Sequence, residues 1–172
     1  MTTTELLLAS IDEAYDKRSW HGTNLRGSLR GVTVEQAAFR VQPKSHNIWE
    51  LAVHAAYWKY DIRRRLNADK GGSSSLSEAT ASGRRAGGFP LEGGDFWDRP
   101  VDGTETEWKA DLALLQDEHK QLRAVVEAFP PSRWARKAPG KPFNFEGLVR
   151  GVAAHDLYHA GQIQLLKKLQ QS

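Results

Sequence analysis

The chain has 172 residues, of which 40% are hydrophobic and 26% charged, and this length and composition predict one soluble globular domain spanning residues 1–172. It contains no cysteine, which excludes disulfide bonds, thiolate metal ligands and a cysteine nucleophile. The formal net charge of +3 comes from dispersed basic residues rather than from a continuous basic face, so we expect no binding to nucleic acid.

Two long amphipathic helices are predicted in the first half of the chain. The first covers about residues 3–17, with apolar side chains on one side. The second starts after Asn47, a good N-cap residue, and ends near residue 69; Glu50 completes its capping box. Between them we expect a helical turn or two at residues 24–29 and a short helix that is capped by Thr33 and ends at Phe39.

Residues 70–103 form a segment of a different kind. They are rich in glycine, serine and proline, which favours irregular structure. A connection of this length is unusual in a compact domain, so it predicts a crossover or an active-site flap. Phe89, Phe96 and Trp97 are expected to anchor its second half to the body.

Two further long helices are predicted after this connection. One begins at Thr104 or Thr106 and continues to about Phe129, where consecutive prolines end it. The other is capped by Asn144 and continues to about Gln170. Since no segment alternates like a strand, the sequence predicts an all-α fold: a four-helix bundle with a long crossover connection between its second and third helices.

Three histidines occupy the apolar stripes of these helices. His155 and His159 are four residues apart in the last helix, which places both rings on one face, one turn apart. His54 lies on the stripe of the second helix, between Leu51 and Trp58. A buried polar ring without a partner costs roughly 2–7 kcal/mol, and a metal ion is a partner that imidazole commonly finds.

A hydrogen-bonded core histidine is the simpler interpretation of any one of these residues taken alone. Three together, on stripes that a bundle turns to its core, favour a metal site with His54, His155 and His159 as ligands. Three nitrogen ligands leave coordination positions open, which is typical of a catalytic site. Such an ion lowers the pKa of bound water or thiol and polarises a substrate.

The other candidate residues are interpreted more simply. His119 is predicted to be structural, His46 is expected to be exposed, and His21 is a weak candidate for the mouth of a pocket. Glu50 has two open interpretations, as a helix cap or as a carboxylate that orients His54. Tyr158 and Gln162 adjoin the pair in the last helix and are candidates for hydrogen bonds at the site.

The histidine motif and the aromatic residues each have an alternative interpretation. The segment at residues 155–159 is similar to the H-E-x-x-H helix of zinc proteases, but Asp156 replaces the glutamate and no protease domain surrounds it, so a protease is rejected. Trp49, Tyr57 and Trp58 are interpreted as core and interface packing rather than as a substrate box.

Three segments resemble the DinB-like (DinB/YfiT) superfamily of metal-binding four-helix bundles. They are residues 20–22 (WHG), residues 47–54 (NIWELAVH) and residues 155–163 (HDLYHAGQI). The resemblance implies a divalent ion, either nickel, zinc, iron or manganese, held by His54, His155 and His159. It also implies that the protein forms a homodimer. Characterised members of the superfamily include thiol-dependent transferases and isomerases that use bacillithiol, mycothiol or glutathione, so the resemblance implies an activity of this kind.

The leading hypothesis is a metal-dependent enzyme. We expect it in the cytoplasm, because the N-terminus lacks the pattern of a signal peptide and no apolar run is long enough to span a membrane. The ion activates water or a low-molecular-weight thiol for attack on a small electrophilic substrate, as in an S-transferase or hydrolase; no general base is assigned. The alternative is a non-catalytic bundle that binds a small ligand or a partner and keeps a structural or vestigial metal site.

Overall fold

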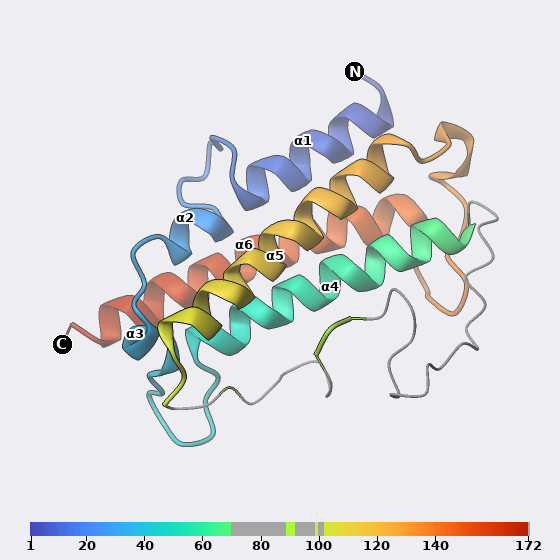
Figure 1. Ribbon diagram of the computed structural model, residues 1–172. Coiled ribbons are helices and arrows are strands. Elements are labelled where there is room, and N and C mark those ends of the chain that lie inside the picture. The colour runs from blue at the N-terminus through green and yellow to red at the C-terminus, as the bar shows by residue number, and fades with distance from the viewer. Residues whose placement is uncertain (70–88, 92–98, 100–101, 172) are drawn as a thin grey trace, which may run out of the picture.

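The computed structural model describes residues 1–69, 89–91, 99 and 102–171, and their regular structure is helical apart from one isolated bridge between Lys137 and Asn144. The all-α prediction is therefore confirmed for this part of the chain. The elements, shown in Figure 1, are α1 (Thr3–Tyr15), α2 (Leu25–Leu29), α3 (Val34–Ala38), α4 (Ile48–Asp69), α5 (Glu105–Glu127), the 3₁₀ turn η1 (Pro131–Arg133) and α6 (Phe145–Leu169).

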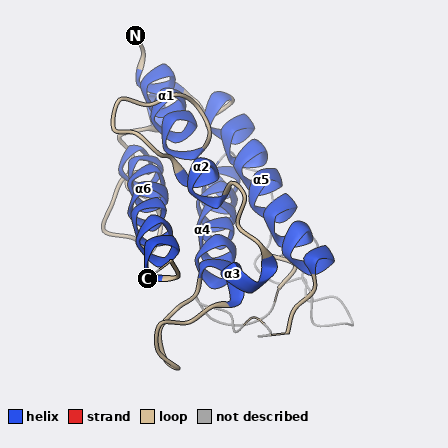
Figure 2. Ribbon diagram, turned by 90° about the vertical axis from the view of Figure 1, so that its left-hand side faces the viewer, coloured by secondary structure: helices blue, strands red, loops and turns tan. Residues whose placement is uncertain are grey.

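The four long helices lie along one another. Helix α4 packs against both α5 and α6, and α1 packs against the same two helices from the other side (Figures 1 and 2). The short helices α2 and α3 contact α6 and α4, respectively. None of the helices in the described residues is both long and apolar enough to cross a bilayer.

The helix starts follow the predicted capping residues. The Thr33 side chain caps α3, Asn47 accepts a hydrogen bond from the Glu50 N–H at 2.8 Å, and Asn144 accepts one from the Gly147 N–H at 2.8 Å. Such caps stabilise a helix by about 1 kcal/mol each. The ends are less regular: α1 stops at Tyr15, two residues before its predicted end, because Asp16 leaves helical geometry.

Tryptophans fill the core where α4 faces α5. The rings of Trp49 and Trp108 lie edge to face with centroids 5.4 Å apart, and both are fully buried. Each indole N–H has an acceptor, since Trp49 donates to Asp111 at 2.6 Å and Trp108 to the Val32 carbonyl at 3.0 Å. The predicted core role of Trp49 is confirmed, with the satisfied N–H that a buried indole needs.

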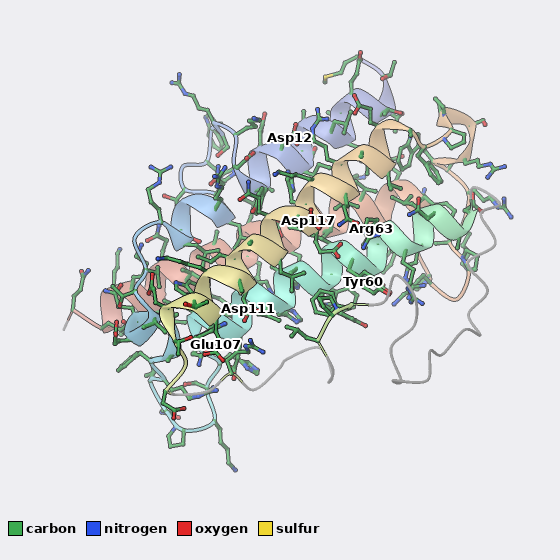
Figure 3. All side chains as sticks on the ribbon, viewed as in Figure 1. Asp12, Tyr60, Arg63, Glu107, Asp111 and Asp117 are labelled. Carbon is green, nitrogen blue, oxygen red and sulfur yellow. The ribbon has the colours of Figure 1, made fainter. Side chains whose placement is uncertain are left out.

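The outer side of the α4–α5 contact carries polar and aromatic side chains (Figure 3). Arg63 of α4 donates two hydrogen bonds to the Glu118 carboxylate of α5, at 2.9 and 3.0 Å, and lies over the Tyr60 ring. Phe89, at the start of the short described stretch of the connection, contacts the rings of Tyr57 and Tyr60, so its predicted anchoring role is confirmed. Phe96, Trp97 and most of the 70–103 connection lie outside the described residues.

Candidate metal centre

Three histidine rings meet between α4 and α6. His54 comes from the middle of α4, and His155 and His159 come from adjacent turns of α6. The Nε2 atom of His155 lies 3.0 Å from Nε2 of His54 and 3.0 Å from Nε2 of His159. The structure thus brings together the three rings singled out in the sequence, and one nitrogen from each lies within 4.8 Å of the other two.

Hydrogen bonding alone does not account for this arrangement. A neutral imidazole nitrogen carries either one proton or one lone pair, so Nε2 of His155 can form only one well-directed hydrogen bond. It nevertheless has two nitrogen neighbours at the same distance. A cation accepts all three lone pairs at once, and metal–nitrogen bonds of 2.0–2.1 Å place neighbouring ligand atoms about 2.9–3.4 Å apart. The two distances of 3.0 Å from Nε2 of His155 fit that range.

The hydrogen bonds of His159 select the tautomer that a metal requires. Its Nδ1 lies 2.6 Å from Oε1 of Gln162, and the Gln162 amide nitrogen donates to the Tyr158 hydroxyl at 3.2 Å. Because Oε1 can only accept, Nδ1 carries the proton and Nε2 keeps its lone pair. Partners of this kind are typical of metal-binding histidines. Both residues that were expected to hydrogen-bond at the site do so.

Burial keeps two of the rings neutral. It lowers the pKa of His155 to about 3, assisted by its two histidine neighbours, and it lowers the pKa of His159 to about 4, against the opposing effect of the Gln162 hydrogen bond. Neutral imidazole is the form that binds metal, so these rings need not lose a proton near pH 7.

A family model described as the DinB superfamily matches residues 18–163. The chain belongs to the DinB superfamily. The matched region contains all three histidines; it begins just after α1 and ends within the last two turns of α6. No curated protein and no solved structure matches the chain significantly.

In this DinB-superfamily chain a pocket of about 450 Å³ opens beside the triad. Its walls come from α4, from α6 and from the loop before α6. They consist of His54, Trp58, Ile62, Phe143, Gly147, Leu148, Gly151, Val152 and His155. The interpretation of Trp58 as packing alone was therefore incomplete, because its ring packs on the core and also faces this pocket, edge-on to His54 and His155.

The sequence interpretation missed the wall formed by Phe143, Gly147 and Gly151. A signal for the two glycines was available, since they precede His155 by eight and four residues and therefore share its helical face. Phe143 has no such periodic signal because it lies in the loop before α6.

The remaining histidines lie outside the triad. His119 is buried and stacks on the Tyr15 ring with centroids 4.0 Å apart, and burial lowers its pKa to about 3. This environment agrees with its predicted structural role. His46 is exposed, as predicted, and contacts Glu50. His21 is exposed and does not line the pocket.

Glu50 serves as a capping and pairing residue. One of its carboxylate oxygens accepts a hydrogen bond from the Asn47 N–H at 3.2 Å and lies 3.1 Å from the His46 ring nitrogen. Arg40 binds both oxygens. Burial acts to raise the pKa of this carboxyl, but these contacts together outweigh burial and hold the pKa below its usual value. The helix-cap interpretation accounts for Glu50.

Replacing Gln162 with leucine is expected to weaken metal binding without unfolding the protein. The side chain is only partly buried, but it supplies the acceptor that fixes the His159 tautomer. Loss of such a partner typically lowers metal affinity by about 10–100-fold. Zinc affinity measured by competition with a chromogenic chelator tests this, and Gln162→Glu, which retains an acceptor oxygen, should recover most of the loss. Equal affinities in all three proteins would contradict the assigned role.

Proposed function

We propose that this chain is a metal-dependent enzyme in which His54, His155 and His159 hold a divalent ion. The observation that carries the proposal is the meeting of three Nε2 atoms at one point beside an open pocket. Residues 1–172 are proposed to form one bundle domain, with residues 70–103 as the crossover between α4 and α5. The homodimer implied by the family resemblance is part of the same proposal.

The proposed reaction is attack by water or a low-molecular-weight thiol on a small electrophilic substrate, as in an S-transferase or a hydrolase. When bound, the ion supplies Lewis acidity, which lowers the pKa of the nucleophile and polarises the substrate. A thiol nucleophile has to arrive from solution, because the chain contains no cysteine.

The protein's own residues orient a ligand of the triad and line the pocket with apolar side chains. Gln162 orients the His159 ring through Nδ1, and its hydrogen bond to Tyr158 orients the amide in turn. Ile62, Leu148 and Val152 supply an apolar wall beside the triad. Since electrostatic interactions strengthen where water is excluded, a substrate enclosed here would be polarised more strongly than at an open surface.

The direct test is metal binding by untagged protein. We expect about one equivalent of zinc, nickel, iron or manganese per chain, measured by inductively coupled plasma mass spectrometry. At a free metal concentration 100 times the Kd, binding should stabilise the fold by about 2.7 kcal/mol, which corresponds to a rise in Tm of about 5–10 °C for a chain of this size. Chelation with EDTA should reverse the shift.

Protein that binds none of these ions, and whose Tm does not respond to any of them, would overturn the proposal. The chain would then be a non-catalytic bundle. Once metal binding is established, electrophilic model substrates are incubated with bacillithiol, mycothiol or glutathione. Formation of a thiol conjugate indicates a transferase, and formation of the hydrolysed substrate indicates a hydrolase.

A further inference from the structure

We infer that the pocket beside the triad receives an uncharged apolar group of the substrate, with an aromatic ring as the best fit. The inference rests on the proposed function and specifies which electrophiles the site accepts. The pocket holds about 450 Å³, far more than a water or a metal ion needs, so a substantial part of the substrate fits there.

The chemistry of the walls points to an apolar ligand. The described side chains that line the pocket are aliphatic or aromatic, apart from the two histidines of the triad. No charged side chain of the described residues lines it, so a charged group placed there would find no ionic partner among the residues of the pocket wall. An apolar group instead gains about 25 cal/mol for each Å² that it buries.

Gly151 contributes bare helix backbone to the pocket wall, at a position exposed to solvent. It lies one turn before His155 on α6, and a Cβ atom added there would meet nothing within 4 Å. Gly147 differs, because a Cβ there would lie 2.9 Å from the Asn144 side chain that caps the helix. The cap therefore explains Gly147, whereas no contact of the fold requires glycine at 151. Gly151 and His155 line the same pocket, one helical turn apart.

Trp58 joins the apolar walls to the histidines. Its ring meets His54 edge-on with centroids 6.2 Å apart and meets His155 with centroids 6.1 Å apart. An apolar group in the pocket therefore lies next to two of the three rings, so a donor atom attached to that group is within reach of the triad. A flat ring suits both the bare backbone at Gly151 and the indole of Trp58.

Two metal-chelating probes of different size test the inference. Acetohydroxamate and benzohydroxamate share one chelating group, and they differ in carrying a methyl group or a phenyl ring. In titrations of the zinc-loaded protein followed by calorimetry, benzohydroxamate should bind about tenfold more tightly than acetohydroxamate, because the phenyl ring buries apolar surface in the pocket.

Gly151→Leu and Gly161→Leu form a matched pair of variants. Both glycines lie in α6, an added Cβ meets nothing within 4 Å at either, and leucine favours the helix at both, but only Gly151 lines the pocket. Gly151→Leu should reduce the preference for the phenyl probe to within about twofold, with acetohydroxamate binding unchanged. Gly161→Leu should keep the wild-type preference. Gly151→Ala should be intermediate, which gives a milder variant if the leucine perturbs folding.

A wild type without phenyl preference, or a Gly151→Leu variant that keeps it, would overturn the inference while leaving metal binding intact. Zinc-loaded protein that binds neither hydroxamate would also overturn the inference. Failure of the proposed function is distinguishable from these results, because the wild type would then retain no zinc before any probe is added.

Discussion

Replacing His155 with alanine is expected to abolish the metal-dependent part of the protein's stability. His155 is the central member of the triad, since its Nε2 atom lies 3.0 Å from each of the other two. Loss of a partner outside the ligand set costs about 10–100-fold in affinity, so loss of this ligand should cost at least about 100-fold. The rise in Tm with zinc or nickel, about 5–10 °C in the wild type, should therefore disappear at the same metal concentration.

His119→Ala is the matched control, because His119 is also a buried histidine with a pKa lowered to about 3. Its ring packs on Tyr15, away from the triad, so truncation leaves a cavity and should lower the Tm with and without metal. The rise in Tm on adding metal should persist. If His155→Ala kept the metal response, or if His119→Ala lost it, the assignment of the ligands would be wrong.

The predictable part of this fold lies in its local signals. Thr33, Asn47 and Asn144 marked helix starts because capping depends on side chains within three residues. His155 and His159 could be placed on one face from helical periodicity alone. His54 meets these two residues if α4 and α6 are neighbours and turn their apolar faces inward. This is the expected arrangement in a small helical bundle.

The pocket was less predictable because it depends on the absence of side chains and on tertiary contacts. Gly151 carries no hydrophobic signal, and its proposed role follows from its place in the pocket wall. Phe143 reaches the pocket from a loop whose path periodicity does not determine. Trp58 was correctly placed on an inward stripe, but a stripe position does not reveal whether a ring is enclosed by core on all sides or faces a cavity.

A buried ion pair between α4 and α6 was also not foreseen. Lys59 and Asp156 are almost completely buried and hydrogen-bonded to each other, and the Lys59 ammonium lies 5.1 Å from the centroid of the Tyr15 ring. Charged residues are seldom fully buried, so the sequence pattern assigns them to the surface. Asp156 directly follows His155, and Lys59 lies five residues after His54, so this pair connects the two helices that supply the triad.

Lys59→Met is expected to destabilise the protein by about 3–5 kcal/mol, because it leaves the Asp156 carboxyl buried without its cation. Burial already raises the pKa of Asp156 to about 6, although Lys59 opposes this rise. Without Lys59 the pKa of Asp156 in the folded state rises further, whereas in the unfolded state it stays near the ordinary value of about 4. Between these two pKa values the folded protein keeps a proton on Asp156 that the unfolded chain has released. Stability is therefore lost as the pH rises, so urea denaturation should show a larger deficit at pH 8 than at pH 5.

The double variant Lys59→Met/Asp156→Leu separates the cost of an unpaired charge from the contribution of the pair. Because desolvation offsets much of the attraction within a buried pair, replacing both partners with apolar side chains should restore stability to within about 1 kcal/mol of the wild type, or exceed it. Lys109→Met, at an exposed position paired with Glu105 one turn away, should change little. A double variant as unstable as Lys59→Met would mean that the ion pair itself holds α4 and α6 together. A restored variant that still binds zinc would mean that apolar contacts between these helices are sufficient to bring His54 to His155 and His159.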